Sequence, residues 1–206
     1  MATLNFLTGN QGKLSEAHDL LRSLGYNVQS FQIDGEIPDI IEPQSDSLTT
    51  VALAKIAQGV ELLAANERLH ELLLVEDSGL FIESLPDFPG VYSASVFKSL
   101  GCEGILKLLG NEREARFMTT IALWTGEAVE VFIGVCEGYI STEIRGQGGF
   151  GYDPIFVPHS GNQGRTFAEM TTEEKSSMSH RGRALSALYD YLEGTESNVG
   201  IPNTEP

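Results

Sequence analysis

The segment ATLNFLTGNQGKLSEAHDLL, residues 2–21, decides the fold, because its hydrophobic period changes at a loop that contains two glycines. Residues 2–7 have the composition of a short buried strand, and TGNQGK at 8–13 forms the loop after it. From Gly12 to Leu24 apolar residues recur at helical spacing, and Gly25 is a suitable stop. A second strand is predicted over 26–33. This order of strand, helix and strand indicates an α/β domain.

The rest of the chain extends the same pattern. The sequence predicts a carboxylate-rich loop over 38–47, a helix over 46–65, a strand over 72–83 that breaks at Asp77-Ser78-Gly79, and a short helix over 101–109. Further on it predicts two strands over 115–125 and 128–140, a short strand at 155–157, and a helix over 179–192 with Ser179 as N-cap. We therefore expect an α/β fold with a mixed sheet. Residues 1–193 are predicted to form a single domain, and residues 194–206 a disordered tail.

Composition excludes several classes of protein. No run of about 18 apolar residues is present, and the N-terminus lacks a signal peptide pattern, so no membrane span is expected. The two cysteines, Cys102 and Cys136, are too few for a disulfide scaffold and have no zinc-ligand spacing, so we expect a reduced, cytoplasmic protein. The 13 Lys and Arg against 29 Asp and Glu give a net charge of −16, which argues against nucleic-acid binding through phosphates. An acidic surface also suits a salt-rich cytoplasm.

The loop TGNQGK follows a strand and opens a helix. That arrangement points backbone N–H groups and the positive end of the helix at an anion, and Lys13 adds a positive charge. The spacing is not that of a Walker A loop. Two interpretations remain open, a phosphate site and a simple helix cap with an exposed lysine.

Acidic residues form a second candidate site. Glu76 and Asp77 end a strongly apolar segment, where unpartnered carboxylates are costly, and Glu42 lies in a separate acidic loop. Carboxylates beside a turn, together with substrate phosphates, are ligands that Mg²⁺ prefers. The alternative is a turn with a capping aspartate.

Two further stretches are unusual in chemistry. In SHRGRAL three basic residues, His180, Arg181 and Arg183, crowd a helix N-terminus, which indicates either a bound anion or polar ligand, or solvated surface charge. GQGGFGYDPIF, residues 146–156, satisfies G-x-G-x-x-G, but Pro154 prevents the helix that a dinucleotide site needs. This loop would instead contact a ligand, with Phe150 stacking on a base and Asp153 accepting hydrogen bonds; the alternative is a tight connection with Phe150 in the core.

Taken in order, six elements resemble the inosine/xanthosine triphosphate pyrophosphatase family over about residues 4–192: TGNQGK, the acidic loop at Glu42, VEDSGL, FPGVYSA, GFGYDPIF and SHRGRAL. The resemblance implies an elongated, twisted mixed sheet flanked by helices, with two lobes around a substrate cleft. It implies magnesium-dependent hydrolysis of inosine, deoxyinosine and xanthosine triphosphates to the monophosphate and pyrophosphate, with manganese as a substitute ion. The biological use would be cleansing of the nucleotide pool, and the protein would be a homodimer.

The resemblance also assigns residues. It makes Asp77 the catalytic proton acceptor and, with Glu42, the metal ligand. The acidic pair is Glu76-Asp77, where many bacterial relatives have two aspartates, so the role of Glu76 stays open. The substrate-binding residues that it implies are Thr8, Gly9, Asn10, Gln11, Gly12, Lys13, Lys55, Ser78, Phe150, Gly151, Tyr152, Asp153, Lys175, His180 and Arg181.

Two other functions remain open. One is a pyrophosphatase of the related Maf type that acts on pyrimidine or modified nucleotides. The motifs SHRGRAL and GFGYDP argue against this alternative. The other is a nucleotide-binding protein that does not hydrolyse, for which the acidic residues Glu42 and Asp77 would be unnecessary.

Overall fold

The computed structural model describes residues 2–160 and 163–199. Its sheet has seven strands in the order β2-β1-β3-β5-β6-β7, with β4 paired to the far end of β3. Strands β1 (Ala2–Phe6), β2 (Tyr26–Ser30) and β3 (Leu72–Ile82) run parallel. Strands β4 (Phe88–Gly90), β5 (Glu114–Trp124), β6 (Val129–Ile140) and β7 (Phe156–Pro158) add antiparallel pairs. The fold is therefore the α/β arrangement with a mixed sheet that the sequence predicts.

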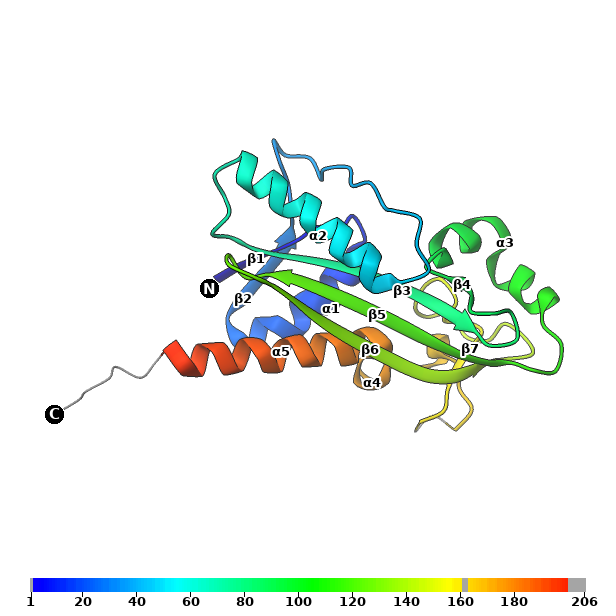
Figure 1. The fold of residues 1–206 in the computed structure, drawn as a ribbon. Coiled ribbons are helices and arrows are strands. Elements are labelled where there is room, and N and C mark those ends of the chain that lie inside the picture. Colours follow the sequence, from blue (N-terminus) through cyan, green and yellow to red (C-terminus); the bar gives the residue numbers. More distant parts are fainter. Residues whose placement is uncertain (1, 161–162, 200–206) are drawn as a thin grey trace.

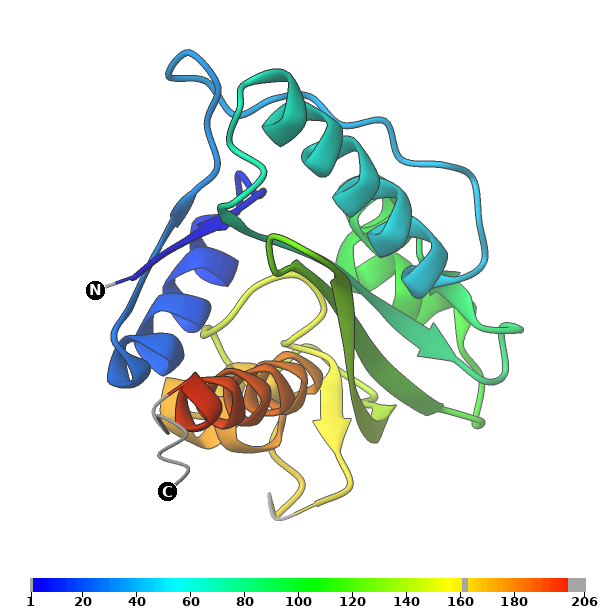
Figure 2. The same cartoon turned by 60° about the vertical axis from the view of Figure 1, so that its left-hand side comes forward.

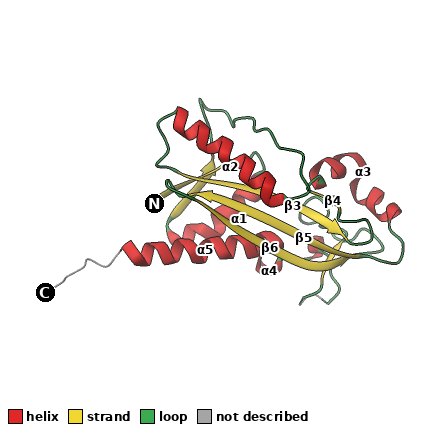
Figure 3. Cartoon of the chain, viewed as in Figure 1, coloured by secondary structure: helices red, strands yellow, loops and turns green. Residues whose placement is uncertain are grey.

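Helices cover both faces of the sheet (Figure 1). Helices α1 (Gln11–Leu21) and α5 (His180–Val199) lie on one face, with α4 (Thr172–Met178) beside α5, and α2 (Leu48–Ala65) lies on the other. The turned view of Figure 2 shows this separation of α2 from α1 and α5. Helix α3 (Ser93–Leu108) lies at the opposite end of the molecule from β1 and β2, and the long strands β3, β5 and β6 connect the two ends (Figure 3).

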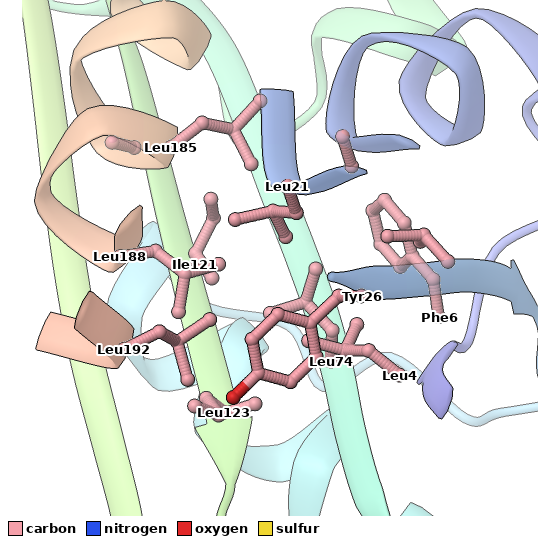
Figure 4. Packing of buried hydrophobic residues seen from close by; sticks show 13 residues of the cluster. Leu4, Phe6, Leu21, Tyr26, Leu74, Ile121, Leu123, Leu185, Leu188 and Leu192 are labelled. Atoms are coloured by element: carbon pink, nitrogen blue, oxygen red, sulfur yellow. The ribbon is translucent and has the colours of Figure 1, made fainter. Parts of the chain in front are cut away.

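Three clusters of buried side chains fill this frame. One joins α1 and α5 to the sheet, through residues such as Leu21, Leu74 and Leu188 (Figure 4). A second lies under α2, and a third fills the distal end around Phe117 and Phe156. The first two clusters form the core of one lobe, and the third forms the core of the other. The long strands β3, β5 and β6 run through both lobes.

Strand β3 corrects the predicted break at Asp77-Ser78-Gly79. The strand is continuous from Leu72 to Ile82, and Asp77 pairs in register with Thr120 of β5. Gly79 serves a close approach rather than a turn, because a Cβ there would lie 2.2 Å from the carbonyl oxygen of Gly90 on β4. The acidic pair therefore lies in the middle of a strand and not at its end.

Two helices are longer than predicted. Helix α3 begins at Ser93 rather than 101, and it is interrupted at Gly101, whose φ of 60° interrupts the helical path. Helix α5 begins after Ser179, whose Oγ accepts a hydrogen bond from the N–H of Gly182, so the predicted N-cap is confirmed. It continues to Val199, so residues 194–199 are helical and not a disordered tail; residues 200–206 of that prediction lie outside the described residues.

Helix α2 is long and apolar enough to cross a membrane by length and composition alone, although it is not an unbroken run of apolar residues. It packs on β3 and β5 with Val51, Ala52, Ile56 and Leu63 buried, and it carries Lys55 into the candidate site. These contacts are those of a core helix.

Candidate active site

The phosphate-loop candidate has the predicted local structure. Strand β1 ends at Phe6, and α1 begins at Gln11 with Asn10 as its N-cap. The Asn10 Oδ1 atom accepts hydrogen bonds from the N–H groups of Gly12 at 2.9 Å and Lys13 at 3.2 Å. The cap holds the first turn of α1 so that the Lys13 side chain enters the site.

Glu76 holds cations from two helices on one face of the sheet. Because side chains alternate along a strand, Glu76 points to the α1 and α5 face while Asp77 points to the α2 face. Glu76 is 3% exposed, and both its carboxylate oxygens lie 3.0 Å from Nε of Arg181. Nζ of Lys13 lies 3.2 Å from Oε1 of Glu76. Burial alone would raise the pKa of Glu76, but Arg181 and Lys13 bring it below the ordinary value. Glu76 is therefore an ionised anchor that orients Lys13 and Arg181.

This anchor shows that Arg181 of SHRGRAL is not a solvated surface charge. The guanidinium of Arg181 is 2% exposed and lies between Glu76 and Glu16, with Nη1 3.0 Å from Glu16 Oε2. Arg183 donates to the carbonyl oxygen of Val135 on β6 instead of facing a ligand. Glu76 and Glu16 thus balance the charge of Arg181 within the protein, and its contact with a substrate stays a prediction.

Asp77 has different surroundings from its neighbour. Its Oδ1 lies 3.5 Å from Nζ of Lys55, which also lies 2.8 Å from Glu42 Oε1. Its Oδ2 is buried and has no hydrogen-bond partner among the described residues. Burial raises the pKa of Asp77 to about 6, although Lys55 and Lys13 oppose the shift. A carboxylate with an unpartnered oxygen and a pKa near neutrality is suited to take up a proton.

Glu42 and Asp77 also form a donor set for a metal ion. The described residues contain no group of three or more His, Cys, Asp or Glu side chains arranged for a metal. Mg²⁺ is commonly held by one or two carboxylates, with water and substrate phosphates as its other ligands. The unpartnered Oδ2 of Asp77 and the half-exposed carboxylate of Glu42 fit such an ion.

The glycine-rich loop forms the other end of the site. No helix follows it, as predicted: β7 begins at Phe156, and Gly146 and Gly148 pack closely against Ala168. The Phe150 ring is 43% exposed, so it is not in the core. Lys175 Nζ lies 4.8 Å and the Arg181 guanidinium carbon 5.3 Å from its centre.

Asp153, which is predicted to contact a base, also has partners within the protein. Its Oδ2 accepts from the N–H of Phe150 at 2.7 Å and from Lys175 Nζ at 2.7 Å, and the residue is 3% exposed. The carboxylate therefore fixes the loop and the lysine, and its contact with a ligand stays a prediction.

His180 lies at the same end and is uncharged. Its ring stacks on Phe117 with centroids 4.5 Å apart. Burial, and then the neighbouring cations Arg181, Lys175 and Lys13, lower its pKa well below the ordinary value. A neutral imidazole offers one N–H donor and one acceptor nitrogen to its surroundings.

A cavity of about 650 Å³ connects these groups. Its lining includes Asn10, Lys13, Glu42, Lys55, Asp77, Ser78, Phe150, Gly151, Tyr152, Asp153, Lys175, His180 and Arg181 from the predicted set. Thr8 and Gly9 belong to the loop beside it, Gln11 and Gly12 belong to the first turn of α1, and none of the four lines it. Lys13 and Arg181 are 168 positions apart in the chain, and Glu42 and Tyr152 are 110 apart, so these residues share one site only through the fold.

Other lining residues were not assigned from the sequence. Gln44 and Ser45 follow Glu42, and Ser93, Ser95, Phe97 and Lys98 come from the start of α3. Tyr152 ties that helix to the glycine loop, because its hydroxyl donates to the carbonyl oxygen of Ser93 at 3.1 Å and its ring meets Phe97 edge-on. The sequence feature that could have pointed to the start of α3 is the motif FPGVYSA, which contributed to the resemblance although no role was assigned to its residues.

Comparison with known proteins agrees with this geometry. The model of the Ham1 family matches residues 4–191. A dITP/XTP pyrophosphatase of Thermococcus kodakarensis is 48% identical over 92% of this chain and 96% of that protein, and one of Pyrococcus horikoshii is 43% identical over 91% and 95%. The solved structure of a HAM1 protein from Coxiella burnetii is 32% identical and superimposes with a TM-score of 0.81, covering 94% of this chain and 100% of that one. The chain belongs to the Ham1 family.

Proposed function

We propose that this protein hydrolyses inosine, deoxyinosine and xanthosine triphosphates to the nucleoside monophosphate and pyrophosphate. The names of its relatives support this activity. The observation that carries it in the structure is Asp77, a carboxylate with an unpartnered oxygen that faces Lys55 in the cavity. Removal of deaminated purine nucleotides from the nucleotide pool is the proposed biological use.

Glu42 and Asp77 would hold Mg²⁺, or Mn²⁺ in its place. When bound, the ion would neutralise charge on the phosphate oxygens. Lys55 contacts both carboxylates in the present arrangement, so it would be displaced toward the phosphates when the ion enters.

The chain supplies the remaining chemistry. Asp77 accepts a proton from a water molecule while the oxygen of that water attacks the α-phosphorus. The bond from the α-phosphorus to the oxygen that bridges it to the β-phosphorus breaks. The electron pair of this bond leaves with pyrophosphate. Lys13 and Lys55 stabilise the negative charge that spreads over the phosphates, and positioning accounts for much of the rate enhancement.

Base choice follows from the polar groups at the other end. Hypoxanthine and xanthine carry an oxygen at position 6, where adenine carries an amino group. The neutral ring of His180 can present its N–H to that oxygen, whereas adenine would leave buried polar groups unpaired. The partly exposed ring of Phe150 provides a surface for stacking.

The first test is pyrophosphate release from dITP, XTP, GTP, ATP and dTTP, with Mg²⁺ and with a chelator. Release from dITP and XTP that the chelator abolishes is the expected result. Release mainly from dTTP would identify a pyrimidine nucleotide pyrophosphatase, and binding of dITP without release would identify a non-hydrolysing binding protein.

Asp77→Asn tests the proton acceptor. The amide cannot take up the proton, so kcat for dITP should fall by about 10²–10⁴-fold while the circular dichroism spectrum is retained. Asp190→Asn, on the exposed surface of α5, is the matched control and should keep wild-type kcat. Wild-type turnover by Asp77→Asn would remove Asp77 from the mechanism.

A further inference from the structure

Lys98 differs from the other cations of the cavity. It lies on the first half of α3 and lines the cavity, yet it makes no hydrogen bond or ion pair with any described residue. The other cations are balanced within the fold: Lys13 and Arg181 by Glu76 and Glu16, Lys55 by Glu42 and Asp77, and Lys175 by Asp153. Lys98 therefore carries the uncommitted positive charge of the site.

The helix that carries Lys98 is fixed to the site. Ala94, Ser95 and Lys98 all line the cavity, and residues three apart on a helix share a face, so this face of α3 looks into the cavity. Ser93 and Phe97 anchor the same segment to Tyr152 of the glycine loop. The interruption at Gly101 then separates this anchored half from the rest of the helix.

The charge of the substrate identifies what Lys98 would bind. The base and the deoxyribose of dITP are neutral, and most of the negative charge of this nucleotide is on the two phosphates that leave as pyrophosphate. The site around Asp77 is close to neutral without Lys98, because its lysines and arginine are already paired. An ammonium group on a flexible stem is suited to follow phosphates that move away during the reaction.

We propose that Lys98 is a substrate-binding residue that contacts the β- and γ-phosphates from the distal lobe, opposite Lys13 and Lys55. Because Lys98 has no partner among the described residues, its contribution is to the bound phosphates and not to stability. This inference rests on the proposed pyrophosphatase activity.

The test is product inhibition of dITP hydrolysis by pyrophosphate and, separately, by dIMP. Replacement of the ammonium in Lys98→Gln should weaken inhibition by pyrophosphate about 10-fold or more and raise KM for dITP, since a hydrogen bond to a charged group is lost. Inhibition by dIMP should stay at the wild-type level. Lys98→Arg, which keeps the charge, should restore inhibition by pyrophosphate.

Lys107→Gln is the matched control, because Lys107 is an exposed lysine of the same helix that does not line the cavity. It removes the same charge and should leave both inhibition constants unchanged. The proposal is overturned if Lys98→Gln keeps wild-type inhibition by pyrophosphate, or if it weakens inhibition by dIMP instead. It is also overturned if Lys107→Gln gives the same loss, or if pyrophosphate does not inhibit the wild-type enzyme. A wild-type protein that releases no pyrophosphate from dITP would instead contradict the proposed activity itself.

Discussion

At the scale of single residues, Glu76 and Asp77 show how one position along a strand changes the role of a carboxylate. Glu76 is fully paired with Arg181 and Lys13, and its pKa is lowered; Asp77 has one unpartnered oxygen, and burial raises its pKa to about 6. The resemblance found in the sequence makes Asp77 the proton acceptor, but it leaves the role of Glu76 open. The partners of Glu76 come from α1 and α5, which are far apart in the chain.

The raised pKa of Asp77 implies a cost to stability. An aspartate that titrates at 3.8 when unfolded and at about 6 when folded destabilises the native state by about 3 kcal/mol once the pH is above 6. In that window the native state binds more protons than the unfolded state, so stability falls as pH rises from about 4 to about 6. Asp77→Asn should therefore raise the free energy of unfolding by about 1–3 kcal/mol at pH 8.

Urea unfolding in the presence of a chelator, at pH 8 and at pH 4.5, measures this effect. The gain from Asp77→Asn should shrink at pH 4.5, where the wild-type carboxyl is protonated in the folded state. Asp190→Asn should change stability little at either pH. An equal gain at both pH values, or a loss at pH 8, would show that burial of the charge is not the cause.

At the scale of elements, hydrophobic period predicts most helices and strands, and glycine causes the main errors. The strands over 115–125 and 128–140 agree with β5 and β6 within one residue. The sequence pattern predicts a turn at Gly79 and the start of a helix at Gly101. In the structure Gly79 lets β4 approach β3, and Gly101 interrupts a helix that has already begun at Ser93. A local pattern does not show whether a glycine serves a turn or a distant neighbour.

Gly194 tests the length of α5. It lies inside the helix, beyond the predicted end at 192, and a Cβ there would have no atom within 4 Å. Because alanine favours a helix interior over glycine, Gly194→Ala should stabilise the protein by about 0.5–1 kcal/mol in urea unfolding. In contrast, Gly134→Ala on β6 should destabilise it strongly, since its Cβ would lie 2.0 Å from the carbonyl oxygen of His180. No gain from Gly194→Ala would place the end of the stable helix before residue 194.

At the scale of the whole molecule, the first part of β6 lies at an edge of the sheet and carries exposed apolar side chains. Strand β7 pairs with β6 only at residues 138–140, so residues 129–137 have a strand partner on one side only among the described residues. Val129, Val131 and Ile133 point to the same face, and they are 38%, 38% and 51% exposed. Exposed sheet edges and contiguous apolar side chains are typical of association sites. We propose that a second copy of the chain covers this stripe in a homodimer.

Ile133→Lys tests that arrangement, because it places a charge in the middle of the stripe. Light scattering after gel filtration should give a dimer mass for the wild type and a monomer mass for Ile133→Lys. Ile144→Lys, which changes a similarly exposed isoleucine outside β6, should remain a dimer.

Since the chain carries a net charge of −16, the two copies repel each other, and the uncharged stripe must supply the attraction. The wild-type dimer should therefore dissociate more readily at low ionic strength, where this repulsion is least screened. A wild-type monomer at all salt concentrations, or a dimer that Ile133→Lys leaves intact, would contradict this surface as the interface.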